Sequence, residues 1–261
     1  MIAAHLDNNK YCVIIPARLN SSRFPGKVMW KFRNMPMIEH VYRRTCLNFP
    51  AKHIYIVSGD NEILNHMSSV GANVIISEKI HNNGTSRSAE AAFHLPYENI
   101  IIIQADEILL DPEHLSTLLN DMNKNIDHNF FNLVTSLSDR TELDDISIVK
   151  CIMEQDNAIS FLFRKIEDIQ EVPGKFNKVM GVLAFRKDYL HRLTKKPDSK
   201  LQKITSIEQF KILENGFNLR GVPVDYGYPS INNPEDIDIV KRLIEKSKIQ
   251  KTILWEYENR K

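Results

Sequence analysis

The sequence predicts an α/β fold with a mostly parallel, Rossmann-like sheet, helices on both faces of that sheet and a β-hairpin excursion in the second half. Two observations lead to this prediction. Short apolar runs rich in β-branched residues alternate with segments of helical periodicity across residues 11–104, and this alternation is typical of parallel strands joined by crossover helices. At residues 148–164, two strand-like segments are separated only by a turn, which indicates a hairpin.

The first half of the chain supplies the parallel strands. Each predicted strand is a short apolar run that ends at a polar loop or turn, as expected for a strand buried on both faces. These runs are Tyr11–Pro16, His53–Ser58, Ala72–Ile76 and Asn99–Gln104. The predicted helices between them are Pro36–Cys46, Glu62–Val70 and Arg87–Phe93. Because ligands of such sheets bind beyond the carboxyl ends of the strands, the loops there are the candidate functional segments.

The second half of the chain is less regular. Its predicted strands are Phe131–Ser136, the hairpin pair Ile148–Met153 and Ala158–Arg164, Val179–Phe185 and Leu219–Val224. Its predicted helices are Asp111–Met122, Ser206–Leu213 with Ser206 as N-cap, and Asn233–Lys246. We therefore expect a single domain over residues 1–246, with the hairpin region at about 145–190, followed by a C-terminal tail over 247–261.

Composition excludes several classes of protein. The chain has 261 residues and a formal net charge of +1, from 34 Lys and Arg against 33 Asp and Glu, which argues against a nucleic-acid binder. Its three cysteines are scattered without CxxC spacing, which suits a reducing compartment. The first residues lack the pattern of a signal peptide, and no apolar run approaches the roughly 20 residues that span a bilayer. We expect a cytoplasmic protein without membrane insertion.

The loop after the first strand gathers positive charge. Arg18, Arg23 and Lys27 lie within ten residues, beside Ser22 and a flexible glycine, Gly26. Several cations and closely approaching backbone N–H groups are what a triphosphate requires. The loop is neither a GxxxxGK[ST] nor a GxGxxG motif. Composition alone leaves two interpretations open, a phosphate-binding loop or solvated loop cations.

Six motifs resemble those of one family. Residues 14–27, IIPARLNSSRFPGK, resemble the IIPAR-x-x-S-x-R-x-PGK signature of the 3-deoxy-manno-octulosonate (Kdo) cytidylyltransferases and related sugar nucleotidyltransferases. The others, in the family's order, are NMPMIEH (34–40), HNNGTSRSAE (81–90), IIIQADEILL (101–110), SIEQFKIL (206–213) and INNPEDI (231–237). The resemblance covers most of the chain. It implies a glycosyltransferase-A-like nucleotidyltransferase fold and a homodimer, for which residues 145–190 would supply the contact and part of the acceptor side.

The resemblance also implies a nucleotide site. Its residues would be Pro16, Ala17, Arg18, Ser22, Arg23, Lys27, His81, Gly84, Thr85, Arg87 and Gln104. Within it Arg18, Arg23 and Lys27 would hold the β- and γ-phosphates. Arg18, Lys27 and Asp106 would be the catalytic residues. From the residues alone, His81 is only a loop histidine.

The metal site and the acceptor site are implied in the same way. Asp106 and Asn232 would hold Mg²⁺, although Asp106 can also be interpreted as a helix N-cap. Asn232 stands where the family has an aspartate, so one negative charge is lost and Mg²⁺ should bind more weakly. Glu208 and Gln209 match the family's acceptor-contacting pair.

Other motif positions depart from the family. Val179 and Leu183 replace a histidine and a tyrosine, and Ala105 and Ile108 replace a glycine and a proline. A site that loses polar partners changes its preference among sugar hydroxyls. We therefore expect an acceptor other than Kdo itself, or a changed catalytic arrangement.

The functional prediction is a Mg²⁺-dependent cytidylyltransferase. It would transfer CMP from CTP to a hydroxyl of a sugar acid, releasing pyrophosphate, and would serve surface polysaccharide (lipopolysaccharide) synthesis. Two alternatives stay open. One is the same chemistry on another acidic sugar or a phosphonate. The other is a catalytically weak homologue that binds nucleotide, which the Asn232 substitution motivates.

Overall fold

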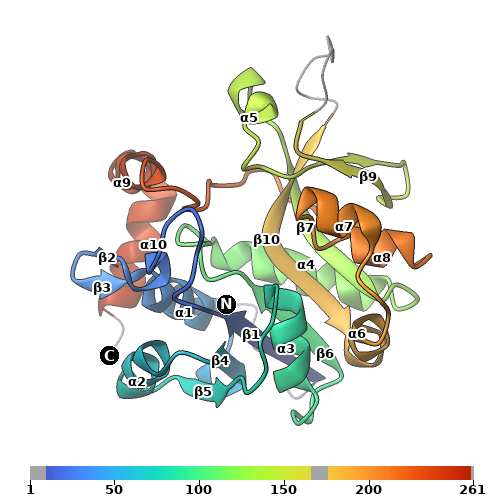
Figure 1. The fold of residues 1–261 in the computed structure, drawn as a ribbon. Coiled ribbons are helices and arrows are strands. Elements are labelled where there is room, and N and C mark those ends of the chain that lie inside the picture. Colours follow the sequence, from blue (N-terminus) through green and yellow to red (C-terminus); the bar gives the residue numbers. More distant parts are fainter. Residues whose placement is uncertain (1–9, 166–175, 260–261) are drawn as a thin grey trace. The chain divides into compact units, whose positions relative to one another are not determined.

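The computed structural model describes residues 10–165 and 176–259, and these form two compact units (Figure 1). The first comprises Met1–Ser116 with Tyr228–Lys261, and the second comprises Thr117–Gly227. The boundary falls within helix α4 (Pro112–Lys124). Whether residues 1–246 behave as a single domain stays a prediction. All residues predicted for the nucleotide and the metal lie in the first unit, whereas the acceptor pair lies in the second.

The first unit is built on four parallel strands. They are β1 (Tyr11–Pro16), β4 (Ile54–Ser58), β5 (Asn73–Ile76) and β6 (Asn99–Ile103). Their order is β6-β1-β4-β5, with Val13 opposite both Ile54 and Ile101. Every residue of β1 and β6 is buried, which is why both read as unbroken apolar runs. The predicted α/β fold with a parallel sheet is confirmed.

Helices cover both faces of this sheet. They include α1 (Met37–Asn48), α2 (Asn61–Ser69) and α3 (Gly84–Ala92). The path from β1 through β4 to β5 runs in one direction, and the path from β5 to β6 turns back. Because crossovers are right-handed, α1 and α2 lie on one face and α3 on the other, where it packs against β1, β4 and β6 (Figure 1). The reversal puts a switch point between β1 and β6, which is where open α/β sheets bind ligands.

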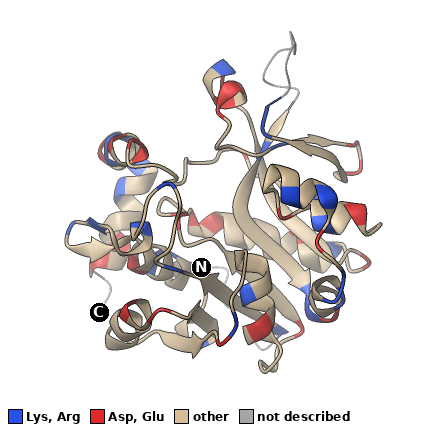
Figure 2. Ribbon diagram, in the orientation of Figure 1, with Lys and Arg blue, Asp and Glu red and all other residues tan. Residues whose placement is uncertain are grey.

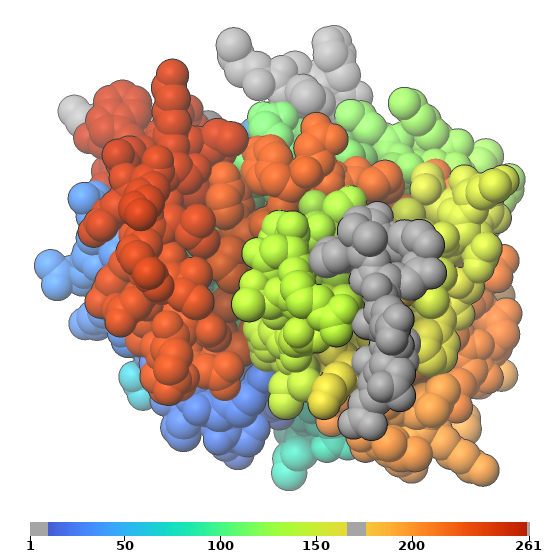
Figure 3. Space-filling model, turned by 90° about the horizontal axis from the view of Figure 1, so that it is seen from above, coloured from blue at the N-terminus to red at the C-terminus, as the bar shows by residue number. Residues whose placement is uncertain are grey.

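The last helices complete the first unit. Residues 247–261 were predicted to be a tail, but α10 (Lys248–Asn259) is a helix that packs against α1 and against α9 (Asp236–Lys246). Its Ile253, Leu254 and Tyr257 belong to a hydrophobic core cluster. Figure 3 shows α9 and α10 as a continuous red surface. The remaining short elements are η2 (Lys27–Met29), β2 (Lys31–Phe32), β3 (Met35–Pro36) and η3 (Ala51–His53).

The second unit contains the predicted hairpin. Its strands are β7 (Phe130–Ser136), β8 (Lys150–Met153), β9 (Ile159–Phe163), β10 (Asn177–Arg186) and β11 (Arg220–Pro223). Strands β8 and β9 form an antiparallel pair, β8 pairs with β10, and β7 lies between β10 and β11. Its short helices are α5 (Arg140–Asp144), α6 (Lys187–Thr194), α7 (Lys200–Thr205) and α8 (Phe210–Glu214).

The predicted start of the helix at 206–213 is wrong. Ser206 was expected to be the N-cap of a helix over 206–213, but it is the C-cap of α7, with a left-handed φ of 56°. The following helix, α8, begins only at Phe210. A serine hydroxyl favours an N-cap, but here Arg164 donates hydrogen bonds to the carbonyls of Thr205 and Ser206 and holds the turn. The predicted helix at 87–93 also begins earlier, at Gly84.

The surface fits the nearly neutral composition. Acidic and basic side chains both occur on the helices of each unit (Figure 2), so each unit carries charges of both signs. No helix in the described part of the chain is long and apolar enough to cross a membrane.

Candidate active site

The loop that follows β1 is held by its backbone. The Ala17 N–H donates to Val57 O at 2.9 Å, and the Gly26 N–H donates to Leu19 O at 2.8 Å, which closes the loop on itself. Gly26 has a φ of 71°, in the left-handed region where a side chain is strained. The glycine of the predicted phosphate loop is therefore required by backbone conformation.

An acidic residue from the next strand also fixes this loop. Asp60, just after β4, accepts a hydrogen bond from the Leu19 N–H at 2.8 Å, and its own N–H donates to Ser58 Oγ at 3.0 Å. Arg87 on α3 donates to Ala17 O. The segment that carries Arg18 is thus anchored on both sides. Arg18 itself is exposed, and burial of Arg87 together with the nearby charge of Arg18 lowers the pKa of Arg87.

Lys27 and Asp106, from the segments that follow β1 and β6, contact each other. The Lys27 Nζ lies 2.6 Å from Asp106 Oδ2 and also donates to Ile231 O at 3.0 Å. Both side chains are mostly buried, with 13% and 22% of their surface exposed. The Ile231 N–H donates back to Asp106 O at 3.2 Å. The structure therefore brings together a cation from the phosphate loop, the predicted catalytic carboxylate and the segment that precedes Asn232.

Asn232 lies beside the second cation of the loop. Its Oδ1 accepts a hydrogen bond from Arg23 Nη2 at 3.0 Å, on the exposed side of the site. Asp236, in the first turn of α9, accepts hydrogen bonds from the Asn232 and Asn233 N–H groups, both at 2.7 Å. Helix α9 thus fixes the backbone of the loop that presents Asn232.

A second group of predicted residues gathers at the start of α3. A Cβ added to Gly84 would lie 2.9 Å from Gln104 Oε1, closer than real Cβ atoms come to other atoms, and 3.1 Å from Pro16 Cγ, which is a tight contact. Gly84 therefore lets the Gln104 amide lie against the first turn of α3, where Thr85 is buried. Pro16, Gly84 and Gln104 form one surface between the ends of β1 and β6.

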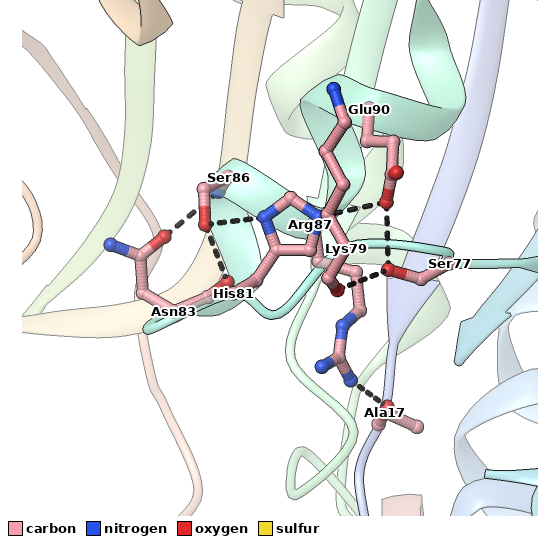
Figure 4. Close-up of polar contacts among 8 residues, drawn as sticks. All are labelled: Ala17, Ser77, Lys79, His81, Asn83, Ser86, Arg87 and Glu90. Atoms are coloured by element: carbon pink, nitrogen blue, oxygen red, sulfur yellow. Dashed lines mark hydrogen bonds and ion pairs between the residues drawn. The ribbon is translucent and has the colours of Figure 1, made fainter. Parts of the chain in front are cut away.

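His81 contacts protein groups through both ring nitrogens (Figure 4). Its Nε2 lies 2.7 Å from Glu90 Oε2, and its Nδ1 lies 3.2 Å from Ser86 Oγ. Ser77 Oγ also donates to Glu90, at 2.8 Å. Burial alone would raise the pKa of Glu90, but the hydrogen bonds from His81 and Ser77 outweigh it and lower that pKa. This network fixes the 77–83 loop onto α3, whose N-cap Asn83 accepts from the Ser86 N–H.

The predicted acceptor residues lie in the second unit, just before α8. Gln209 is buried, and its Nε2 donates to Asn132 Oδ1 on β7 at 3.0 Å. Glu208 is half-buried. Ser22, predicted for the nucleotide, is exposed on the loop of the first unit.

The donor set at Asp106 fits a cation held partly by a substrate. No group of three or more His, Cys, Asp and Glu residues in the described ranges is arranged to hold a metal by itself. Asp106 supplies one carboxylate, and only one of its side-chain oxygens, Oδ2, is engaged by a described residue, Lys27. Mg²⁺ is commonly bound by one or two carboxylates together with substrate phosphates and water. The residues present match that mode and not an all-protein cage.

One acidic residue that shapes the site, Asp60, was missed in the sequence, where Gly59 and Asp60 indicate only a turn. Asp236 is a candidate from the sequence for replacing the carboxylate lost at Asn232, as are Asp225 and Glu235; in the structure Asp236 accepts hydrogen bonds from the backbone of the Asn232 loop. A signal for Asp60 was available, because it follows the strand beside β1 directly and carboxyl ends of adjacent parallel strands meet at one edge. No such signal indicates that Asp236 holds the backbone of residues 232 and 233, because that role depends on the conformation of the 231–233 loop.

Comparison with known proteins identifies the family of this chain and agrees with its fold. A family model described as cytidylyltransferase matches residues 12–226. A 3-deoxy-manno-octulosonate cytidylyltransferase from Chlorobium limicola is 31% identical over 90% of this chain and 97% of its own. An 8-amino-3,8-dideoxy-manno-octulosonate cytidylyltransferase from Shewanella pealeana is 30% identical over 87% of this chain and 95% of its own.

Solved structures give the same result. A CMP:2-keto-3-deoxy-manno-octonic acid synthetase complexed with CTP has a TM-score of 0.80 and 25% identity, over 91% of this chain and 99% of that one. A putative glucose-1-phosphate thymidylyltransferase from Bacillus anthracis, at 16% identity and a TM-score of 0.63 over 91% of this chain and 96% of that one, shares the fold. The parallel sheet, the PAR…SR-x-PGK loop and the Lys27–Asp106 pair are thus found in a chain that belongs to the cytidylyltransferase family.

Proposed function

We propose that the protein transfers CMP from CTP to a hydroxyl of a sugar acid of the 3-deoxy-octulosonate type, with release of pyrophosphate. The observation that carries this proposal is the convergence of Lys27, Arg23 and Asp106 at the switch point of the sheet, in a chain similar to Kdo cytidylyltransferases along nine-tenths of its length. Such activated sugar acids serve surface polysaccharide synthesis, and we place the reaction in the cytoplasm. The three cysteines form no disulfide among the described residues, which fits a reducing compartment.

The chemistry requires positioning and charge neutralisation more than covalent participation by the protein. The acceptor oxygen attacks the α-phosphorus, the bond from that phosphorus to the bridging oxygen breaks, and pyrophosphate leaves with the added negative charge. Arg18, Arg23 and Lys27 lie on one loop and would neutralise the β- and γ-phosphates. The surface made by Pro16, Gly84 and Gln104 would contact the base and ribose.

Mg²⁺ belongs to this proposal. Asp106 would hold it directly, and the Asn232 carbonyl is the second candidate oxygen. When bound, the ion supplies positive charge at the phosphates. Because Lys27 contacts Asp106 and Arg23 contacts Asn232 in the structure, the phosphates of CTP would draw both cations toward themselves and leave these oxygens open.

Calorimetric titration with CTP, UTP, dTTP, GTP and ATP, each with and without Mg²⁺, tests the donor half of the proposal. We expect selective binding of CTP, strengthened by Mg²⁺. Asn232→Asp adds a carboxylate beside the site. It should increase the factor by which Mg²⁺ raises the affinity for CTP by about tenfold. Asn233→Asp, which adds the same charge one residue away, is the matched control. Absence of binding by any nucleotide would refute the proposed function. If Asn232→Asp and Asn233→Asp increase the effect of Mg²⁺ on CTP affinity equally, residue 232 is not part of the metal site.

The β8–β9 hairpin is the proposed contact between two copies of the chain. Ile152 and Phe161 stand opposite each other on it and are 36% and 45% exposed, and paired exposed apolar residues of this kind mark interaction surfaces. Phe161→Asp is expected to shift the protein from dimer to monomer in sedimentation velocity. Ile76→Asp, at an exposed apolar residue of β5, should leave the sedimentation coefficient unchanged. A monomeric wild type would contradict the dimer.

A further inference from the structure

Strands β7 and β10 are interrupted by a bulge in the second unit. Val179 pairs with Val134 and Leu183 pairs with Asn132, so four steps along β10 match only two along β7. The residues between, Met180 to Val182, leave the regular ladder. Their backbone carbonyls then need other hydrogen-bond donors, because unpaired buried carbonyls are costly.

The side chain of Asn132 supplies these donors. It is fully buried, and its Nδ2 donates to Met180 O at 2.8 Å and to Val182 O at 3.1 Å, with a further contact to Leu133 O at 3.1 Å. Carbonyl oxygens only accept hydrogen bonds, so the amide nitrogen must face them and the amide oxygen must face the other way. The orientation of the Asn132 amide is therefore determined by the bulge.

This orientation passes to Gln209. Asn132 Oδ1 can only accept, and it accepts from Gln209 Nε2 at 3.0 Å. The nitrogen of the Gln209 amide is thus committed to β7, and its Oε1 receives no hydrogen bond from the described residues. The turn at Ser206 determines the direction from which Gln209 reaches β7. Arg164 holds this turn by donating hydrogen bonds to the carbonyls of Thr205 and Ser206.

We infer that Asn132 is a positioning residue that makes Gln209 a hydrogen-bond acceptor toward the sugar acid. The acid must then bring an O–H or N–H donor to Gln209 Oε1. A substrate analogue that lacks a donor at that point would leave the oxygen unpaired and be rejected. The inference rests on the proposed function, and on the family resemblance of SIEQFKIL that implies Gln209 in the acceptor site.

The test compares two variants of the full chain, Asn132→Leu and Gln209→Glu, with wild type. CMP transfer is measured with CTP and either Kdo or 8-amino-3,8-dideoxy-manno-octulosonate. Gln209→Glu leaves the bulge intact but sets a carboxylate oxygen against Asn132 Oδ1, so the side chain turns away. Both variants should raise KM for the acid about tenfold or more, with KM for CTP changed less than about twofold.

Leu133→Ala controls for lost stability, since Leu133 is buried on the opposite face of β7. It should lower the melting temperature without changing KM for the acid. Unchanged KM for the acid in Gln209→Glu, or equal changes in both KM values, would overturn the inference while wild-type activity upholds the proposed function. A wild type that binds CTP but transfers CMP to neither acid would overturn both.

Discussion

Alanine in place of Lys27 or Asp106 is expected to lower kcat by at least about 10²–10³-fold, so that turnover is effectively lost, while the fold stays intact. The Lys27 Nζ and Asp106 Oδ2, from the segments that follow β1 and β6, are 2.6 Å apart, where phosphates of the nucleotide would lie. Lys27 would neutralise charge that develops on the leaving pyrophosphate, and Asp106 would hold Mg²⁺. Pyrophosphate release with CTP and Kdo measures the loss, and circular dichroism measures the fold.

A double variant separates catalysis from structural support. Lys27→Met with Asp106→Asn removes both charges, so no unpaired buried charge is left and the free energy of unfolding should return toward the wild-type value. Activity should not return, because both functional groups are gone. Arg33→Ala is the control for loss of one positive charge, since Arg33 pairs with Glu258 away from the site. Recovery of activity in the double variant would show that the pair is only structural.

The parallel sheet was predictable from the sequence because strands that are buried on both faces consist of uninterrupted apolar residues. Tyr11–Pro16 and Asn99–Ile103 are buried at every residue, so no polar residue interrupts either apolar run until the strand ends. The polar loops at those ends then place Lys27 and Asp106 near each other. Parallel strand order therefore favours this convergence, and in the structure the Lys27 Nζ lies 2.6 Å from Asp106 Oδ2.

The rest of the site depends on contacts between distant parts of the chain. Arg23 and Asn232 are 209 residues apart, and Lys27 and Ile231 are 204 apart, so no local pattern relates them. The same limit explains why α10 was predicted to be a C-terminal tail. Its buried Gln250 has partners, Arg44 and the Leu109 carbonyl, that lie on other elements. Local propensity gives no information about such partners.

The stability of the fold at low pH is expected to depend on His40. This residue on α1 is buried between Phe32 and Tyr257 of α10, with ring centroids 5.6 and 5.8 Å away. Its Nε2 contacts Phe32 O at 2.9 Å, and its Nδ1 contacts Tyr257 OH at 2.6 Å. Since a carbonyl only accepts, Nε2 carries the proton and Nδ1 accepts from the tyrosine hydroxyl. The neutral ring satisfies both partners.

Protonation of this ring is opposed by its surroundings. Burial, with a smaller contribution from the charge of Arg44, lowers the pKa of His40 to about 4 despite the opposing effects of the Phe32 carbonyl and Glu39. The unfolded chain has the ordinary value of 6.5, so between these values the unfolded state binds the proton and the folded state does not. The contribution of neutral His40 to the free energy of unfolding is therefore fully present above about pH 6.5, and it is lost as the pH is lowered toward 4. A shift of this size corresponds to about 3 kcal/mol in total.

Urea unfolding at pH 7.5 and pH 5.0 measures this loss, and we expect wild type to lose about 2 kcal/mol between them from His40. His40→Gln, which keeps a donor and an acceptor but does not titrate, should be less stable at pH 7.5 and lose correspondingly less on acidification. The exposed His94, changed to Gln, should leave the wild-type pH dependence intact. His53 and His191 also have lowered pKa values through burial, so the free energy of unfolding of His40→Gln should still fall on acidification, but by less.

The same protonation should affect nucleotide binding. His40 joins α1 to α10, and α10 packs on α9, the helix that fixes the Asn232 loop. Nucleotide affinity of wild type should therefore weaken over the same pH interval. An identical pH dependence in His40→Gln would show that the acid sensitivity arises elsewhere.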